Sequence, residues 1–221
     1  MTITVENLNK SFFQGTEKIE VIRDLNLKIE KPEVVAVIGQ SGSGKSTFLS
    51  LLSGLDRANS GKIIIAGKDV SVMSEEDLTQ FRAEHISLVF QQYHLVQHLT
   101  ALENVLLPLE IQGKPAGLAA AEELLDQVGL KTRKNHFPSQ LSGGECQRVA
   151  IARALIVKPS VLLADEPSGN LDVGTGASVM DLFLDVVRRN RITTIVVTHN
   201  PELARRCDRV FELKKGHLVE Q

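Results

Sequence analysis

Gly39-Gln40-Ser41-Gly42-Ser43-Gly44-Lys45-Ser46 is the stretch of sequence that decides the fold. It directly follows the apolar run Val34–Ile38, which is typical of a strand buried on both faces. Lys45–Leu52 then has the pattern of a helix that ends near Gly54. A strand, a glycine-rich loop and a helix in this order predict a loop whose backbone N–H groups wrap a polyphosphate. Lys45 is placed to reach the β- and γ-phosphates, and the Ser46 hydroxyl is placed to ligate Mg²⁺.

Two further stretches share the chain with this loop. Leu162-Leu163-Ala164-Asp165-Glu166 is an apolar strand that ends in two carboxylates. Asp165 can emerge beside the loop and hold Mg²⁺, whereas Glu166 points elsewhere and can act as a general base on water. Leu141-Ser142-Gly143-Gly144-Glu145 begins a helix, so free N–H groups, a hydroxyl and the helix dipole face outward together. Alone, an acidic turn and a glycine hinge would be the simpler interpretations, but three motifs in one chain disfavour both.

The bulk composition excludes several classes of protein. The chain has 221 residues, 43% of them apolar and 24% charged, which suits one globular domain with a substantial core. A net charge of −2, no Trp and one Tyr give no reason to expect nucleic-acid binding. The two distant cysteines form no disulfide framework, and we find no secretory signal and no run of about 20 apolar residues that could span a membrane. We therefore expect a cytosolic protein, whose membrane path in any transport role belongs to another chain.

The remaining sequence alternates between strand and helix patterns. Strands are expected at 3–5, 25–29, 61–67, 86–90, 161–164 and 192–197. Helices are expected at 74–84, 116–128 and 142–155, with another through Met180 and Val186. Ser74, with Asp77 three positions later, is a capping signal for the first of these helices. Strands and helices alternating at both ends of the chain predict a mostly parallel sheet with a helical insertion in the middle.

Together, the three motifs resemble those of the ATP-binding subunits of ABC transporters, and the resemblance covers nearly the whole chain. It implies an α/β fold of the P-loop NTPase (RecA-like) type, with a mostly parallel sheet core, an antiparallel β lobe and a helical insertion. The single domain 1–221 would then have its core and β lobe at about 1–92 and 157–221, and its helical subdomain at about 93–156. The resemblance also implies Mg-dependent hydrolysis of ATP, with ATP and Mg²⁺ as cofactors.

The resemblance assigns roles to individual residues. Gln91 matches the Q-loop glutamine, which touches Mg²⁺ or the attacking water, and His199 matches the switch histidine that contacts the γ-phosphate. Phe12 takes the place of the aromatic residue that stacks on adenine; the assignment could instead fall on Phe13, and either ring could simply belong to the core. Catalytic roles fall to Glu166, His199, Gln91 and Lys45, and Mg²⁺ ligation to Ser46, Gln91 and Asp165. Nucleotide contacts fall to Phe12, Gly39, Gln40, Ser41, Gly42, Ser43, Gly44, Lys45, Ser46, Thr47, Ser142, Gly143, Gly144 and Asp172.

The resemblance also implies partners. Ser142, Gly143 and Gly144 would complete the ATP site of a second copy in a head-to-tail dimer that sandwiches two ATP molecules. Ser168-Gly169-Asn170-Leu171-Asp172 matches the D-loop. Cys146 stands where a polar or basic residue is usual, after the residues that are expected to contact phosphate.

Further stretches are similar to one bacterial branch of the family. Phe90-Gln-Gln-Tyr-His-Leu, Thr100-Ala-Leu-Glu-Asn104-Val and Pro108-Leu are similar to the branch of lipoprotein-release, macrolide-export and cell-division ATPases. Within it we expect the lipoprotein-releasing type, bound to integral membrane transporter subunits at the cytoplasmic face of the inner membrane, without nucleic acid. A cell-division or efflux-type ATPase of the same branch and a soluble non-transport ABC ATPase are the alternatives.

Overall fold

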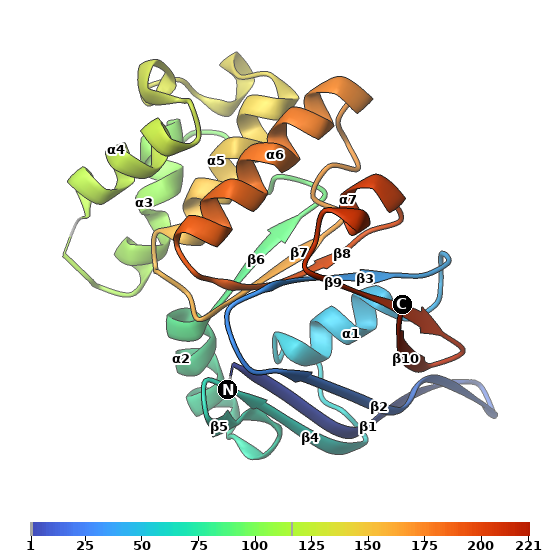
Figure 1. Ribbon diagram of the computed structural model, residues 1–221. Coiled ribbons are helices and arrows are strands. Elements are labelled where there is room, and N and C mark those ends of the chain that lie inside the picture. The colour runs from blue at the N-terminus through green and yellow to red at the C-terminus, as the bar shows by residue number, and fades with distance from the viewer. Residues whose placement is uncertain (1, 116) are drawn as a thin grey trace.

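A six-stranded, mostly parallel sheet forms the central layer of the computed structural model, which describes residues 2–115 and 117–221 (Figure 1). The strand order is β10-β9-β3-β8-β7-β6, and only β10, at one edge, pairs antiparallel to its neighbour. The strands are β3 (Val34–Ile38), β6 (Ile86–Phe90), β7 (Val161–Asp165), β8 (Thr193–Val197), β9 (Arg209–Lys214) and β10 (His217–Glu220).

A second sheet is antiparallel and has four strands in the order β2-β1-β4-β5. Its strands are β1 (Ile3–Gln14), β2 (Glu17–Ile29), β4 (Ser60–Ile65) and β5 (Lys68–Asp69). Helix α1 (Lys45–Leu52) lies between the two sheets (Figure 1). Because the chain enters α1 from β3, the glycine-rich loop sits where the two layers meet.

Helices cover the other face of the central sheet: α5 (Gly143–Leu155) and α6 (Val173–Arg189) cross it, and α3 (Ala101–Ile111) and α4 (Leu118–Gln127) lie beyond them (Figure 1). Helix α2 is Glu75–His85 and α7 is Pro201–Arg205. Ser74 accepts a hydrogen bond from the Asp77 backbone N–H at 3.1 Å, so the predicted cap of α2 is confirmed. Single 3₁₀ turns are η1 (Val70–Val72), η2 (Lys131–Arg133) and η3 (Pro138–Gln140).

Two apolar clusters hold these layers together, because the central strands are buried on both faces. Alternate residues of a strand point to opposite faces. Val34 of β3 therefore packs with the cluster that includes Phe183 of α6, whereas Val35 packs with the cluster that includes Phe48 of α1. All four of these side chains are at most 1% exposed.

The predicted architecture is confirmed, and β3, α1 and β6 have the predicted bounds. The helix predicted at 116–128 is observed as α4, and its expected first residue, Ala116, lies outside the described residues, as does Met1. The lobe boundaries near 92 and 157 stay a prediction. The sequence patterns missed helix α7 and the strands β9 and β10. These two strands extend the central sheet beyond β3.

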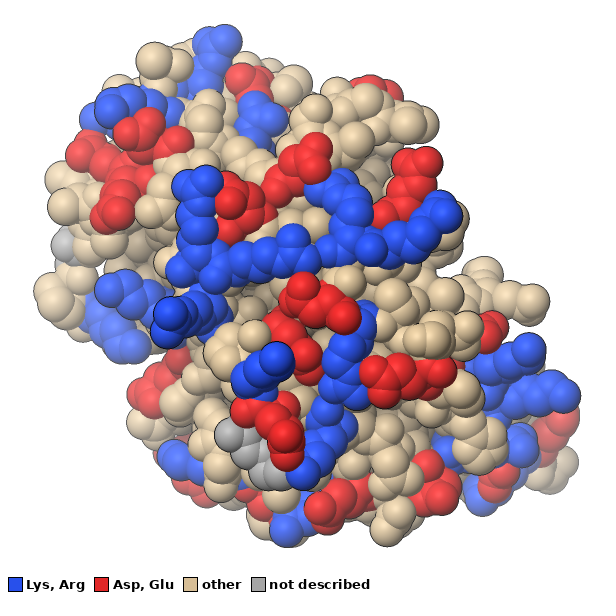
Figure 2. Space-filling view, viewed as in Figure 1, with Lys and Arg blue, Asp and Glu red and all other residues tan. Residues whose placement is uncertain are grey.

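Charged side chains of both signs are interspersed over the face shown in Figure 2. Ion pairs join many charged side chains of the described residues; Arg209, for example, contacts both Glu33, at 3.0 Å, and Glu220, at 2.6 Å. Within the described part of the chain, no helix has the length and apolar character needed to cross a membrane.

Candidate nucleotide-binding site

The carboxyl ends of four parallel strands bring the predicted motifs to one edge of the central sheet. One row of paired residues crosses β3, β8, β7 and β6: Val37, Val197, Asp165 and Phe90. The segments that follow these residues are the glycine-rich loop, the loop with His199, the turn at Glu166, and Gln91. This edge of a parallel sheet is where α/β proteins commonly bind ligands.

The glycine-rich loop folds around the ammonium group of Lys45. Lys45 Nζ donates to the carbonyl oxygens of Gly39 at 2.8 Å and Gln40 at 2.9 Å, and the side chain is buried. Gly42 has a φ of 77° and open space where a side chain would stand. Gly44 has a φ of 99°, and a Cβ there would lie 2.7 Å from Val21. The loop thus requires glycine for its conformation, and its backbone is open at Gly42.

An open pocket of about 620 Å³ lies against this loop. That volume lies within the usual range of small-molecule sites. Its walls come from the loop and α1 (Ser41, Gly42, Gly44, Lys45, Ser46, Thr47), the β1–β2 hairpin (Phe12, Ile19, Val21) and the strand ends (Asp165, Glu166, His199). Of the two adjacent phenylalanines, Phe12 lines the pocket, and Phe13 is 71% exposed without lining it. Gly39, Gln40 and Ser43 belong to the same loop but do not line the pocket.

Asp165 is held in a half-buried position beside Ser46 and Lys45. Burial raises the pKa of the Asp165 carboxyl above its ordinary value. The Ser46 hydroxyl opposes this rise in pKa, the neighbouring Glu166 adds to it, and the Lys45 ammonium opposes it. The protein alone therefore leaves the negative charge of Asp165 poorly compensated. A bound cation would lower the free-energy cost of ionising this carboxyl.

Glu166 contacts His199 directly. Glu166 Oε1 lies 2.8 Å from His199 Nδ1, and Glu166 Oε2 accepts from the His199 backbone N–H at 3.3 Å. Glu166 has a φ of 46°, a left-handed conformation that is costly for a residue with a side chain. Its backbone N–H donates to Val197 O at 2.9 Å, which fixes this turn to β8. The strained turn places the carboxylate and the imidazole together at the pocket wall.

Gln91 is not brought into this pocket. Its side-chain Nε2 donates to Asn170 Oδ1, and Asn170 Nδ2 donates to the Gln91 carbonyl oxygen, each at 3.0 Å. The Gln91 amide also lies over Gly169, where a Cβ would be only 2.8 Å from Nε2. Any contact between Gln91 and a ligand in the pocket therefore requires this pair with Asn170 to open.

Ser142, Gly143 and Gly144 lie at the start of α5, and none lines the pocket of its own chain. Ser142 Oγ accepts from the Glu145 N–H at 3.3 Å, while Glu145 Oε2 accepts from the Ser142 N–H at 2.8 Å. A Cβ on Gly143 would lie 2.8 Å from the Tyr93 hydroxyl, and one on Gly144 would lie 2.5 Å from Thr175 Cγ2. The two glycines therefore have a packing role within the chain, whatever else they contact.

Asp172 is the N-cap of α6 and accepts from the Thr175 N–H at 3.0 Å, which lowers the pKa of its carboxyl. It lines a separate cavity of about 220 Å³, which Glu166 and His199 also line. The pocket residues that sequence analysis missed, Ile19 and Val21, carry no motif of their own. Only the hairpin register and the packing of the loops place them at the site.

A sequence profile of the family described as ABC transporter matches residues 22–169, more than half of the chain. The chain belongs to the ABC transporter family. The lipoprotein-releasing system ATP-binding protein LolD of Syntrophus aciditrophicus (strain SB) is 47% identical over 219 residues, 98% of this chain and 98% of that protein. The uncharacterized ABC transporter ATP-binding protein YbbA of Escherichia coli (strain K12) is 44% identical over 221 residues, covering 99% of this chain and 97% of that protein.

A solved structure of an ATP-binding cassette has a similar fold. The ATP-binding cassette MJ0796, determined as a dimer in a post-hydrolysis state bound to ADP and Pi, has a TM-score of 0.88 and 39% identity. The alignment covers 99% of this chain and 97% of that one. As an ATP-binding subunit of this family, the chain binds and hydrolyses ATP.

Proposed function

We propose that this chain is the ATPase of a lipoprotein-releasing system. It hydrolyses ATP at the cytoplasmic face of the inner membrane and powers separate integral membrane subunits. The observation that carries this proposal is the 47% identity to the LolD protein of Syntrophus aciditrophicus, which extends over 98% of both chains. The LolD protein of Colwellia psychrerythraea is 48% identical over 96% of this chain and 83% of its own length, and adds support.

The phosphates of ATP bind to the glycine-rich loop. Gly42 leaves its backbone open to the pocket, and α1 begins at Lys45, so its unpaired N–H groups and positive dipole end favour an anion there. Lys45 then exchanges its bonds to Gly39 O and Gln40 O for bonds to the phosphates. These backbone acceptors hold the ammonium near the pocket before the nucleotide arrives.

Mg²⁺ fits the oxygen donors of this site. The Asp165 carboxylate and the Ser46 hydroxyl are hard ligands, and both line the pocket. Among the described residues no group of three or more His, Cys, Asp or Glu side chains could hold a metal, which suits an ion held by one or two protein ligands and the nucleotide. Gln91 would join them after leaving Asn170. When bound, the ion neutralises charge on the phosphates.

Glu166 is the general base, and His199 orients it. The carboxylate accepts from the His199 backbone N–H and lies against the imidazole, so its direction is fixed while it stays within reach of water in the pocket. A base at this position removes a proton from the water that attacks the γ-phosphate. The His199 side chain is 73% exposed, so a phosphate bound in the pocket can reach the imidazole.

A second copy of the chain completes each site. Ser142, Gly143 and Gly144 lie outside the pocket of their own chain, on a helix N-terminus that presents N–H groups outward. A head-to-tail pair would place this end over the partner's open pocket. Asp172, at the start of α6, lies in the D-loop that faces the same edge. The dimeric state of the MJ0796 cassette supports this arrangement.

Depletion of the chain in its source organism tests the lipoprotein proposal. We expect lipoproteins to accumulate in the inner membrane on depletion and to reach their normal place again when wild-type protein is supplied. The Glu166→Gln protein should not restore sorting, whereas Glu123→Gln, at an exposed position of α4, should do so. Normal lipoprotein sorting in the depleted cells, with a defect in division or drug efflux instead, would contradict the proposal and favour another member of the branch.

A further inference from the structure

Phe12 is exposed to the pocket near the turn of the β1–β2 hairpin. It pairs with Ile19 across the hairpin, and both residues line the pocket. Phe12 is 43% exposed, so part of its surface remains open to the pocket. An aromatic ring in this place offers a flat apolar surface to a planar ligand group.

Lys10 covers the Phe12 ring from within the protein. Its ammonium nitrogen lies over the ring at 4.8 Å from the centroid, which is within the range of a cation–π contact. Lys10 is 9% exposed and does not line the pocket. Since one face of the ring is covered by this cation, the other face is the one available to a ligand.

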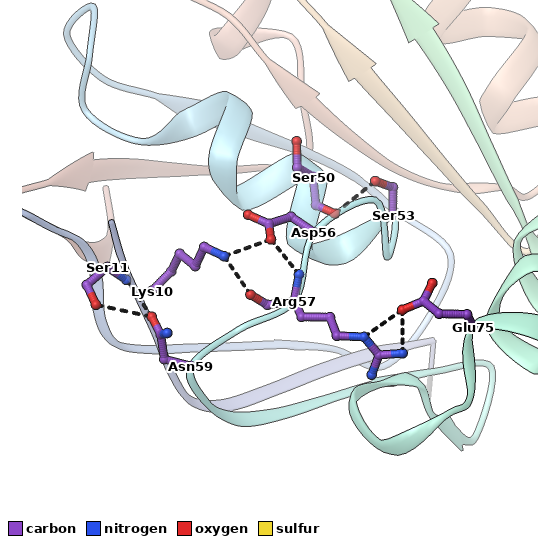
Figure 3. A network of polar contacts seen from close by, with 8 residues as sticks. All are labelled: Lys10, Ser11, Ser50, Ser53, Asp56, Arg57, Asn59 and Glu75. Carbon is purple, nitrogen blue, oxygen red and sulfur yellow. Dashed lines mark hydrogen bonds and ion pairs between the residues drawn. The ribbon is translucent and has the colours of Figure 1, made fainter. Parts of the chain in front are cut away.

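The Lys10 ammonium is itself held firmly (Figure 3). Nζ donates to Asp56 Oδ1 and to the Arg57 carbonyl oxygen, each at 2.7 Å. Asp56 also accepts from the Arg57 N–H at 2.7 Å, so the carboxylate cannot swing away freely. A buried ammonium with two close acceptors has little rotational freedom, and it therefore restrains the Phe12 ring that it contacts.

The β1 strand is deformed in a way that suits this contact. The register of β1 against β2 shifts on both sides of Lys10, and such irregularities re-aim side chains. The Ser11 N–H donates to Asn59 Oδ1 at 2.6 Å (Figure 3). The segment 56–59, which follows α1, therefore accepts hydrogen bonds from two adjacent residues of β1, Lys10 and Ser11. The same helix that carries Lys45 and Ser46 at its start thus leads directly into the segment that fixes Lys10.

We propose that Lys10 is a positioning residue for recognition of the nucleotide base. Held by Asp56 and Arg57, it fixes the Phe12 ring so that the free face stacks on the purine of ATP. The inference rests on the proposed nucleotide site and adds a specificity element to it. A ring that is already fixed loses less conformational entropy when the base stacks on it, so the cation increases affinity for the base and not for the phosphates.

Comparing MgATP with magnesium tripolyphosphate tests this role, because tripolyphosphate has no base. We expect Lys10→Met to weaken MgATP binding about two- to ten-fold in calorimetric titrations, because a ring that is no longer fixed must be ordered when the base binds. Affinity for tripolyphosphate should stay within two-fold of wild type, and Lys10→Arg should bind MgATP nearly as wild type does. Lys18→Met is the matched control, since Lys18 lies on the same hairpin and pairs with Glu20.

A double-mutant cycle separates positioning from a general structural effect. If Lys10 acts through Phe12, the Lys10→Met/Phe12→Ala protein should bind MgATP no more weakly than Phe12→Ala alone. Additive losses, or equal losses for tripolyphosphate and MgATP, would overturn the proposal. Should Lys10→Met unfold because Asp56 loses its partner, Lys10→Met/Asp56→Asn removes both charges and takes its place. A wild-type protein that binds neither ligand would contradict the nucleotide site itself, so the two failures are distinguishable.

Discussion

Replacing Gly144 with alanine should destabilise the protein, because α5 lies very close to α6 at this point. A Cβ on Gly144 would stand 2.5 Å from Thr175 Cγ2, whereas carbon atoms normally approach to about 3.5–4.0 Å. Relieving this overlap requires a shift of about 1 Å. Thr175 is β-branched and follows the N-cap of α6, so its methyl group cannot turn away without cost.

The expected loss follows from two opposing effects. Overpacking a tight contact costs about 1–3 kcal/mol. Alanine regains at most about 1 kcal/mol over glycine from helix propensity, and less in the first turn. We therefore expect a net loss of about 1–2 kcal/mol in the free energy of unfolding, which for a chain of this size lowers Tm by about 2–8 °C.

Thermal unfolding of the nucleotide-free protein, followed by circular dichroism, measures this loss. Gly174→Ala is the matched control, because a Cβ there meets nothing closer than Asp172 Oδ1 at 3.6 Å and should leave Tm unchanged or higher. Thr175→Ser removes the obstructing methyl group, so adding it to Gly144→Ala should restore most of the stability. A Gly144→Ala protein as stable as wild type, or one that Thr175→Ser fails to rescue, would refute the packing explanation.

Three other predictions concern charge, assembly and thiol chemistry. Because burial raises the pKa of Asp165, wild type should lose stability relative to Asp165→Asn as pH rises through the interval between the ordinary and the raised pKa. At neutral pH the variant should therefore melt at a higher temperature, and a lower Tm would contradict this. If Ser142 acts on the partner's site, a dimer of one Lys45→Ala chain and one Ser142→Arg chain has both substitutions in one site and neither in the other. We then expect one tightly bound ATP per mixed dimer when hydrolysis is blocked. A verified mixed dimer that binds none would oppose the head-to-tail arrangement. Burial raises the pKa of the Cys207 thiol to about 11, so maleimide at pH 8 should label it only after unfolding. Rapid labelling of Cys207 in the native protein would show that the thiol is accessible.

Local sequence patterns predicted the parts of the fold that depend on local chemistry. The apolar run of β3 and the glycine-rich loop after it specify a buried strand and a phosphate-binding turn without reference to the rest of the chain. Ser142 and Glu145 likewise specify the start of α5, because a capping box is a contact between near neighbours.

The rest depended on contacts between distant segments. Strand β10 alternates weakly and owes its place to pairing with β9, which the sequence does not reveal. The bonds between Gln91 and Asn170 join residues 79 positions apart. The glycine pair in α5 has a packing reason, at Tyr93 and Thr175, that no pattern around it contains. Motifs therefore predicted a set of candidate site residues, and tertiary packing determined how they are arranged.

ATP turnover by the Glu166→Gln protein is the measurement that tests the proposed mechanism most directly. The amide keeps the shape of the carboxylate next to His199 but cannot accept a proton from water. We expect turnover to fall by about 10²–10⁴-fold, with ATP still bound and unhydrolysed on the protein after gel filtration. Glu123→Gln, remote from the pocket, should hydrolyse ATP at the wild-type rate. A Glu166→Gln protein whose turnover stays within a factor of two of wild type would contradict the assignment of the base and the mechanism built on it.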